Sequence, residues 1–487
     1  MYRTKVKNQL TLDNFILPFG GKLSAENRWV KMADLMPWDM VEDIYNKSLK
    51  TDSKDGRPPI PSRIAFGAIF IKGNERITNE KTLECTTENP YIQYFLGLTE
   101  FRMEPLFDLS MMVYFHKRFP TEEVEKINEE LFRRMNAGDD PPDKGSSDKP
   151  EEPEVVEERT ENEGVLILDA TVSPADIRYP TDLSILNESR ENTEKIIEEL
   201  WPYSNRQGHK TTYSRKRARK QFLIVTKQRK PRNGALQKAI KAQLEYTEQN
   251  LETIEKLFKQ VCDVELWLKH CERLRVIGIV CEQQRKMLTK GTHSCEGRIV
   301  NLRQPHVRPI VRGKAGTPVE FGQKLALSVI KGFTFIEKQS WDNFNEGTTL
   351  IDSAKKYKQR HGCWPKAILA DTIYRTRENR KFCKENGIRL SGPRLGRPKQ
   401  EEIEADKQQA YQDSCDRNMV ESRNGIAKRR YGLDRIFAYG DRTAETEAAM
   451  VVLAMNMALC LRTLLRLFLD QLKNAVWGNI WITALES

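Results

Sequence analysis

The sequence has few cysteines and histidines, and no pattern that would organise them into a metal site or a disulfide framework. Nine cysteines occur in 487 residues, none of them in a C-x-x-C pair. Their odd number is explained most simply by free thiols in a reducing compartment. Cys262, Cys271 and Cys281 flank His270, but steps of nine and ten residues match no compact zinc pattern. The six histidines are too scattered to form a His-rich metal site.

The sequence also lacks an apolar run long enough to span a bilayer. The longest uncharged run in the C-terminal half covers residues 448–461 and is interrupted by Asn456, whereas a spanning helix needs about 20 residues. We therefore expect a core helix there and no membrane partner. The first 19 residues contain no hydrophobic signal region, so nothing marks the chain for export and we expect a cytoplasmic protein.

The sequence is rich in charged residues, and they are unevenly distributed along the chain. Lys and Arg number 80 against 69 Asp and Glu, which gives a net charge of +11. Hydrophobic residues make up 39% of the chain and charged residues 31%. A soluble basic protein of this length should contain two to four domains with sizeable cores.

Two segments of opposite charge divide the chain. Residues 137–163 carry eleven acids, three bases and four prolines without periodicity, and we expect a solvated, disordered linker. Residues 206–232 carry eleven Lys and Arg and no acid. Such a concentration favours a polyanionic partner, because each neutralised phosphate releases counterions; a solvated helix face is the alternative. The candidate DNA contacts in this segment are Arg215, Lys216, Arg217, Arg219 and Lys220.

Residues 25–135 are expected to be mostly helical. The prolines of PPIPSRIAFGAIFIKG end where an apolar stretch begins, which is typical of a helix start. Shorter helices are expected at 78–86, 91–96 and 109–119, and the last ends in a basic tip of His116, Lys117 and Arg118. This pattern permits a helix-turn-helix, although an ordinary helical bundle explains it equally well.

After residue 163 apolar strands alternate with helical stretches. Residues 164–169 and 366–371 read as buried strands, each closed by an aspartate, Asp169 and Asp371. Residues 184–288 show helical periodicity, which suggests a long helix or a helical hairpin. We further expect strands at 298–302, 320–330 and 388–391, helices at 349–360 and 376–386, and a polar helix around residue 421.

Two strand-end aspartates and a helical glutamate can form a cation site. Carboxylates that follow neighbouring buried strands converge at one edge of a sheet. On a helix, Arg417, Glu421 and Lys428 lie within about 40° of one another, so they share a face. Three carboxylates suit Mg²⁺ or Mn²⁺, and a pair of such ions can serve both oxygens of a phosphoryl transfer. Basic neighbours would then hold phosphates.

These residues resemble a known family. The segments LILDATVSPADIRYPTD, AILADTIYRTRENRKF and RNMVESRNGIAKRRYG resemble the three catalytic blocks of DDE transposases of bacterial insertion sequences. The resemblance implies an α/β fold with a ribonuclease H-like mixed sheet, and a metal-binding triad of Asp169, Asp371 and Glu421. The family's glutamate block matches at Arg417, Glu421 and Lys428, but Ser414 replaces its tyrosine, with Tyr411 one turn earlier.

The same resemblance implies a domain plan and a reaction. The plan comprises a helical DNA-binding domain (1–136), the linker (137–163), the catalytic domain (164–184 and 297–465), a basic helical insertion (185–296) and a C-terminal tail (466–487). The implied protein recognises the terminal inverted repeats of its element, cleaves a phosphodiester and joins the freed 3′ hydroxyl to target DNA. It would use Mg²⁺ or Mn²⁺, as two ions. Holding two ends implies at least a homodimer.

Each site residue has a plainer interpretation. A strand-end Asp is often a helix cap or turn former, and Arg417 and Lys428 could pair with acids on their own helix. Asp176 and Asp182 compete for the first acidic position, but neither ends an apolar strand. Glu320 is expected to face solvent beside a strand. Two other functions stay open: a nuclease of the same fold without strand transfer, and a DNA-binding protein that has lost catalysis.

Overall fold

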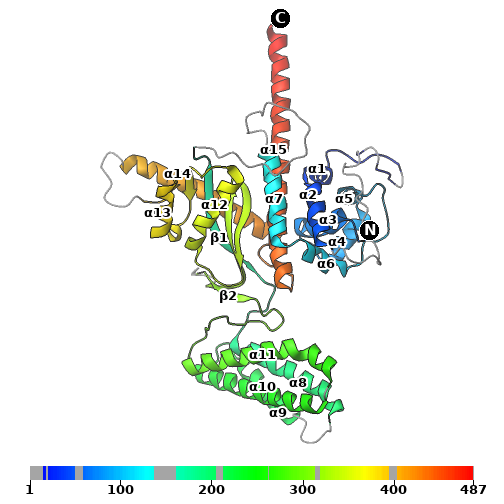
Figure 1. The fold of residues 1–487 in the computed structure, drawn as a ribbon, viewed down its shortest axis with the longest axis vertical. Helices are drawn as coiled ribbons and strands as arrows, with labels where there is room; N and C mark the ends of the chain where they lie inside the picture. The colour runs from blue at the N-terminus through cyan, green and yellow to red at the C-terminus, as the bar shows by residue number, and fades with distance from the viewer. Residues whose placement is uncertain are drawn as a thin grey trace. The chain divides into compact units, whose positions relative to one another are not determined.

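The computed structural model describes residue 12 and residues 15–17, 20–49, 59–136, 161–204, 212–261, 263–312, 318–393 and 403–485. They form two compact units (Figure 1). Unit 1 contains the chain up to Ser173, Lys324–Ser340 and the residues from Phe344 onward; unit 2 contains Pro174–Gln323 and Trp341–Asn343. Most of the expected acidic linker and the start of the basic stretch lie outside the described residues.

The described residues before 137 form seven helices, which confirms that residues 25–135 are mostly helical. The prolines before Ser62 do mark a helix start, since α3 begins at that residue. Aromatic rings fill the centre of this group, where Phe95 packs edge-on against Trp29 and Trp38. The helices are α1 (Arg28–Leu35), α2 (Trp38–Ser48), α3 (Ser62–Glu75), α4 (Asn79–Glu88), α5 (Pro90–Phe95), α6 (Met111–Arg118) and α7 (Thr121–Asn136).

The expected basic tip of α6 is only partly basic. His116 is buried at 6% exposure, and burial, together with the charge of Lys72, lowers its pKa to about 3. Arg118 lies over the ring of Tyr45, 5.1 Å from its centroid. Lys117 is exposed. The helix therefore inserts its histidine into the core as a neutral side chain, and it does not present three charges together.

A mixed sheet follows, with strand order β2-β3-β1-β5-β6, and β4 pairs with β3 outside this path. Strand β5 is parallel to both β1 and β6, while β3 is antiparallel to β2 and to β4. Apolar and β-branched runs buried on both faces account for the central strands. The strands are β1 (Val165–Pro174), β2 (Arg308–Val311), β3 (Val319–Ile330), β4 (Phe333–Ser340), β5 (Ala367–Leu369) and β6 (Arg389–Leu390).

Three of the predicted strands are confirmed, one at residues 298–302 is wrong, and the first is longer than predicted. Strand β1 continues to Pro174, so Asp169 lies in its middle and does not close it. The residues after Asp169, Ala-Thr-Val-Ser, are small or β-branched, and all four are buried. Asp371, in contrast, does follow its strand, because it caps the 3-10 turn η4 (Thr372–Tyr374). Strands β2 and β4 were not anticipated.

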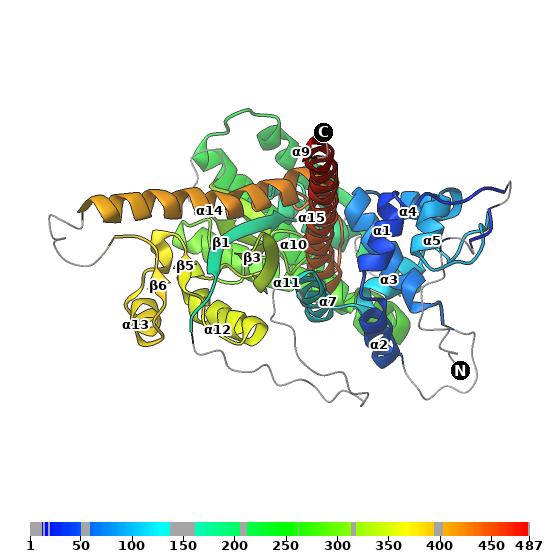
Figure 2. The same ribbon diagram turned by 90° about the horizontal axis from the view of Figure 1, so that it is seen from above.

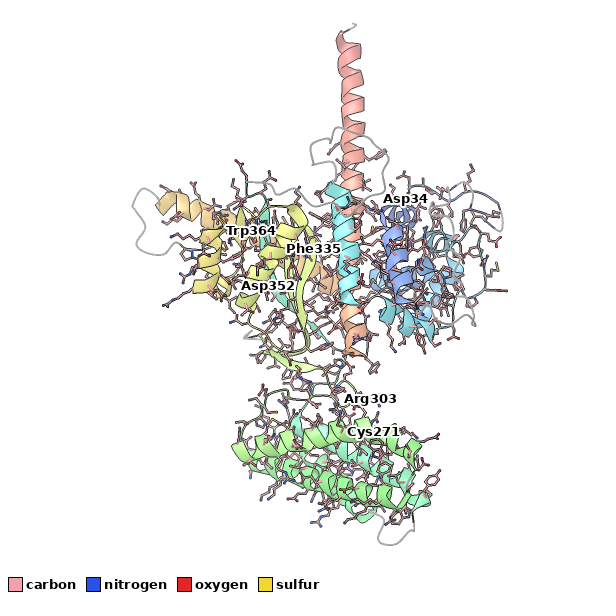
Figure 3. The ribbon with its side chains drawn as sticks, in the orientation of Figure 1. Asp34, Cys271, Arg303, Phe335, Asp352 and Trp364 are labelled. Atoms are coloured by element: carbon pink, nitrogen blue, oxygen red, sulfur yellow. The ribbon has the colours of Figure 1, made fainter. Side chains whose placement is uncertain are left out.

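Helices pack on both sides of the part of the sheet that lies in unit 1. Helices α12 (Leu350–His361) and α13 (Arg377–Glu385) precede β5 and β6, and α14 (Ile403–Tyr431) follows. The last helix, α15 (Asp441–Leu485), packs against α3, α6, α7 and β4. Phe132 of α7 contacts the rings of Phe333 and Phe335 on β4 (Figure 3). The N-terminal helices and the sheet therefore share a core.

The apolar run at 448–461 lies within α15. Between Asp441 and Asp470 this is the one described helix long and apolar enough to cross a membrane, and 61% of its most apolar window is buried within the protein. Met455, Met457 and Cys460 are all at 1% exposure or less. The run therefore serves as a core helix, as the interruption by Asn456 suggested.

Unit 2 is built around four helices, α8 (Asp182–Leu200), α9 (Thr212–Thr226), α10 (Asn233–Val261) and α11 (Val264–Lys290). Thr181 and Ser184 form a capping box that begins α8. Long helices α10 and α11 follow one another directly and pack together, so the hairpin, one of the two predicted alternatives, is correct for this pair. Apolar residues of α8, α10 and α11 form the main core of the unit, with Leu186, Leu244 and Ile277 at 4% exposure or less.

The strand expected at 298–302 is not present. Residues 298–302 belong to no strand, yet Ile299 and Leu302 are buried in the core of unit 2 beside side chains of α10 and α11. The apolar residues that indicated a strand, Ile299, Val300 and Leu302, are buried. The partner of this buried segment is a helical surface, so no ladder of backbone hydrogen bonds forms.

A buried amide in unit 1 gives a first prediction. The Asn456 side chain is fully buried; it donates to Thr334 O at 2.7 Å and Asn128 Oδ1 at 2.8 Å, and accepts from Thr334 N at 3.0 Å. Asn456→Ala leaves these groups unpaired. We expect the free energy of unfolding to fall by about 2–4 kcal/mol, measured by urea denaturation. Asn418→Ala, at an exposed position on α14, is the control and should change it by less than about 0.5 kcal/mol.

Candidate active site

The pairing of β1 with β5 brings two of the predicted acids together. Val165 pairs with Ala367 and Ile167 with Leu369 in a parallel ladder. Continuing this register by two residues sets Asp169 opposite Asp371. Adjacent strands are about 4.8 Å apart. Residues 202 positions apart in the sequence therefore lie beside each other at one end of β5.

The third acid is placed by helix α14. Val420 is buried in a cluster with Ile167 of β1 and Leu369 of β5. Arg389 of β6 adds a second attachment through two hydrogen bonds to Asp413, at 2.7 and 2.8 Å. Figure 2 shows α14 running across β1. Because Asp169 shares a strand face with Ile167, it points toward α14.

Two polar contacts join α14 to the aspartates. Asn424 Nδ2 donates to Asp169 Oδ2 at 2.8 Å. The Arg417 guanidinium lies 3.9 Å from Asp371 Oδ1. Asp371 also accepts a hydrogen bond from Thr372 N at 2.6 Å, as the cap of η4. The cap interpretation is therefore correct for Asp371. The carboxylate is nevertheless 57% exposed, so other groups can still reach it.

The site carries an excess of negative charge. Burial raises the pKa of Asp169 above its ordinary value, and the nearby charges of Glu346 and Glu421 raise it further, while Arg417 and the Ala170 amide oppose them. Glu421 itself is exposed on α14. Because other acids disfavour the ionised form of Asp169, a cation bound here would stabilise that form.

The donor set fits a hard divalent cation. Mg²⁺ and Mn²⁺ prefer carboxylate oxygens, and Asp169, Asp371 and Glu421 supply three such groups from rigid elements. In the part of the chain that the structure describes, no three His, Cys, Asp or Glu side chains are grouped closely enough to hold a metal ion as they stand. Asp169 is instead engaged by Asn424, and Asp371 faces Arg417.

Two residues at the site were missed from the sequence. Asn424 lies three residues after Glu421, which places it on nearly the same helix face, so the spacing could have revealed it. Glu346 begins the short turn η3 (Glu346–Thr349), and no motif there marks it. Lys428 is half-buried one turn after Asn424 on α14.

The competing acids are engaged elsewhere. Asp182 lies in unit 2 and accepts hydrogen bonds from Gln284 at 2.9 Å and Arg298 at 2.8 Å. Asp176 also belongs to unit 2. Glu320 forms an ion pair with Arg312 at 3.3 Å, so it does not simply face solvent. These contacts give each of the two bonded acids a structural role.

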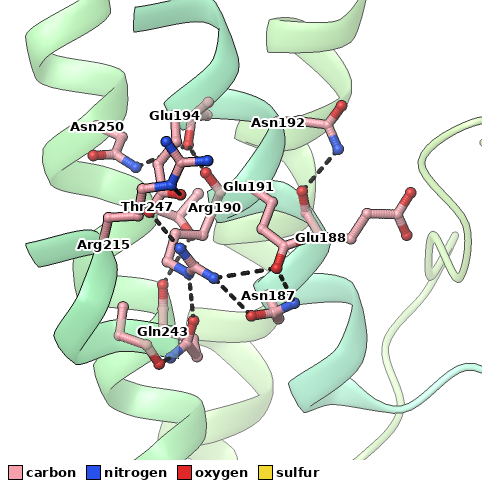
Figure 4. Close-up of polar contacts among 12 residues, drawn as sticks. Asn187, Glu188, Arg190, Glu191, Asn192, Glu194, Arg215, Gln243, Thr247 and Asn250 are labelled. Atoms are coloured by element: carbon pink, nitrogen blue, oxygen red, sulfur yellow. Dashed lines mark hydrogen bonds and ion pairs between the residues drawn. The ribbon is translucent and has the colours of Figure 1, made fainter. Parts of the chain in front are cut away.

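The basic candidates of unit 2 lie on α9 and differ in their surroundings; Figure 4 shows those of Arg215. Arg215 pairs with Glu194 at 3.3 Å and also with Glu198, so its charge is largely neutralised. Glu194 in turn binds Arg190, which is 1% exposed and also donates to Gln243 at 2.9 Å. This network fastens α9 to α8. The other four candidates, all exposed, are Lys216, Arg217, Arg219 and Lys220.

The raised pKa of Asp169 predicts a pH-dependent gain in stability on its neutralisation. A raised folded-state pKa means that ionised Asp169 weakens the fold as pH rises. Asp169→Asn keeps a side-chain acceptor for Asn424 and removes the charge. We expect the melting temperature at pH 8 to rise by a few degrees, at about 2–4 °C per kcal/mol, and the gain to shrink as pH falls toward 4.

Exposed Asp352, in the first turn of α12, is the matched control (Figure 3). Asp352→Asn removes the same charge from a favourable helix N-terminus, so stability should fall slightly or stay unchanged. A lower melting temperature for Asp169→Asn than for the unaltered protein at pH 8 would contradict the electrostatic account.

Comparisons with known proteins agree with this arrangement. Residues 18–118 match the family described as "Transposase domain (DUF772)", and residues 368–458 match "Transposase DDE domain". The latter match includes Asp371 and Glu421. An "Uncharacterized protein ORF8 in nfe locus" of Rhizobium meliloti is 26% identical over 153 residues, 31% of this chain, and the chain spans 64% of that relative's length. No solved structure matches. Two separate segments of the chain therefore match transposase family models, and one of these models is the DDE domain.

Proposed function

We propose that this protein is a DNA transposase that cleaves DNA at transposon ends and joins the freed 3′ hydroxyl to target DNA in a metal-dependent reaction. The observation that supports the proposal is the β1–β5 register. Continued two residues beyond the Ile167–Leu369 pair, it would set Asp169 opposite Asp371, and Val420 packs the helix that bears Glu421 against the same strands. Three carboxylates from three rigid elements are the arrangement that divalent-metal phosphoryl transfer needs.

In this proposal Asp169, Asp371 and Glu421 hold Mg²⁺ or Mn²⁺, as two ions. When bound, such ions supply activation of the attacking oxygen and stabilisation of the leaving oxygen. Asn424 fixes the orientation of Asp169 through its 2.8 Å hydrogen bond. Arg417, beside Asp371, and Lys428, further along α14, hold the phosphates that flank the reacting one.

We propose further that the sheet and its helices form a ribonuclease H-like catalytic domain over 164–184 and 297–465. If the four-residue strand β2 is left aside, Asp169 lies on the first strand and Asp371 follows the fourth, which is the order that the family resemblance implies. Residues 1–136 then serve as the DNA-binding domain, 137–163 as the linker, 185–296 as the basic insertion and 466–487 as the tail.

The partner in this proposal is double-stranded DNA: the terminal inverted repeats and the target. Lys216, Arg217, Arg219 and Lys220 are the phosphate contacts of the insertion, whereas Arg215 chiefly positions α9 through its ion pairs with Glu194 and Glu198. A protein that holds two transposon ends must act as at least a homodimer. We place this activity in the cytoplasm, at the nucleoid.

The catalytic proposal is tested on DNA carrying the element's own ends. Asp371→Asn and Glu421→Gln should each lower the single-turnover rate of Mg²⁺-dependent cleavage and of strand transfer by at least about 100-fold, because each removes a carboxylate from the transition state's cation site. Gel electrophoresis of end-labelled DNA measures both steps. Glu320→Gln, outside the site, is the control and should retain both steps.

The two rival functions give different products in the same experiment. A nuclease would cleave but would leave a pre-cleaved end unjoined to target DNA. A protein that has lost catalysis would bind DNA and show no difference between the unaltered chain and Asp371→Asn. Either result would overturn the proposed transposition.

Salt dependence tests the DNA contacts of α9. Each phosphate contact contributes about 0.9 to the slope of log affinity against log salt. Arg217→Ala combined with Lys220→Ala should therefore reduce that slope by up to about 2, as measured by fluorescence anisotropy from 50 to 200 mM salt. The control removes two equal charges from exposed Lys256 and Lys286 on α10 and α11 and should leave the slope unchanged. Equal slopes for both pairs would contradict the assignment to α9.

A further inference from the structure

We infer that Glu346 is a fourth carboxylate of the cation site, joined to Asp169, Asp371 and Glu421, and that Lys324 is its counter-ion when no metal is bound. This inference rests on the proposed metal-dependent function and adds a residue outside the three DDE blocks. Glu346 is the first residue of η3, a turn that follows β4 and leads into α12.

The position of η3 is fixed against the turn that follows Asp371. The Asn379 amide donates to Gly347 O and to Tyr374 O, both at 2.7 Å, and so ties η3 to η4. The contact is close enough to require a glycine, because a Cβ on Gly347 would lie 2.6 Å from Ile373 O. The residue before Gly347 is Glu346, and the residue before η4 is Asp371. The two acids are therefore carried by turns locked to each other.

The negative charge of Glu346 changes the pKa of other residues at the site. Beyond the effect of burial, its charge raises the pKa of Asp169 and of the buried Tyr374 hydroxyl, and Tyr374 also senses Asp169 and Asp371. Coulomb interactions of this kind require short distances or low screening. Glu346, Asp169, Asp371 and Tyr374 thus share one electrostatic neighbourhood, which Glu421 joins through Asp169.

Lys324 holds this carboxylate in place. Its ammonium lies 2.9 Å from Glu346 Oε1 and donates to Phe344 O at 2.9 Å. Lys324 is only 8% exposed and belongs to β3, the strand next to β1. A nearly buried lysine needs a partner, and this one is satisfied by an acid that faces the proposed metal ligands.

A purely structural ion pair does not explain the placement. The acid that pairs with Lys324 is one whose charge also opposes the ionisation of Asp169. Repulsion among ionised carboxylates lowers stability and is typical of functional sites. Divalent cations reverse this repulsion, because each added carboxylate then strengthens binding.

Mn²⁺ binding, followed by electron paramagnetic resonance of the full chain without DNA, tests the inference directly. We expect Glu346→Gln to weaken Mn²⁺ affinity about tenfold or more, in the range found for groups that support a metal site. Glu320→Gln is the matched control, since Glu320, on β3, is also a partly buried acid paired with a base, Arg312 at 3.3 Å. It should bind Mn²⁺ as the unaltered protein does.

Two further variants separate the possible failures. Lys324→Met removes the counter-ion and keeps the carboxylate, so Mn²⁺ affinity should be retained or increased; a loss equal to that of Glu346→Gln would show that the ion pair matters only for structure and would overturn the inference. Asp371→Asn reports on the site as a whole. If it abolishes Mn²⁺ binding and Glu346→Gln has no effect, the inference fails alone; if neither variant affects binding, the proposed metal site fails as well.

Circular dichroism and thermal unfolding verify that each variant is folded before binding is measured. If Glu346→Gln does not fold, Glu346→Asp keeps the charge on a side chain shorter by one methylene. That variant should bind Mn²⁺ with an affinity between those of the unaltered protein and Asp371→Asn. Full affinity in Glu346→Asp would count against a position in the metal's immediate surroundings.

Discussion

The parallel ladder between β1 and β5 is the constraint on which the candidate site depends. Side chains alternate across a strand, so a slip of one residue would carry Asp169 to the opposite face of the sheet. The observed register instead places Ile167 and Leu369 side by side under Val420. The same apolar contact that stabilises the sheet therefore orients α14, and α14 brings Glu421, Asn424 and Arg417 to the aspartates. The β1–β5 register therefore determines both the packing of α14 and the positions of the candidate site residues.

Repulsion among its carboxylates destabilises the site, and contacts with neighbouring groups offset part of that repulsion. Asp169 is half-buried, and its desolvation together with the charges of Glu346 and Glu421 raises its pKa, so the fold disfavours its ionised form. Compensation comes from single contacts: the Asn424 amide on Asp169, the Arg417 guanidinium near Asp371, and the Lys324 ammonium on Glu346. Each partner offsets part of the repulsion and leaves oxygen lone pairs for other ligands. A site with this balance is stable without cations and gains when cations bind.

The sequence was informative where one residue pattern had one structural solution. Short apolar runs at 164–169 and 366–371 could only be buried strands, and the spacing of Arg417, Glu421 and Lys428 defined a helix face. The sequence was misleading where one residue pattern can pack either in a sheet or against helices. Residues 298–302 pack on helices although their apolar residues indicated a strand, and the small residues after Asp169 continue β1. Glu346 and Arg215 acquire their roles from contacts made only in three dimensions.

Charge placement explains why the proposed reaction needs two kinds of surface. A cluster of carboxylates repels a DNA phosphate, so the acids alone cannot approach their substrate. Arg417 and Lys428 reduce this repulsion at close range, and bound cations would reverse the sign of the local potential. Long-range attraction must come from elsewhere, and the exposed face of α9 supplies four cations without an acid among them. Arg215 forms ion pairs with Glu194 and Glu198 and so attaches α9 to α8. The other four basic candidates of α9 are exposed to solvent. In the proposed reaction, the exposed bases of α9 attract the polyanion and the carboxylates of unit 1 act on it.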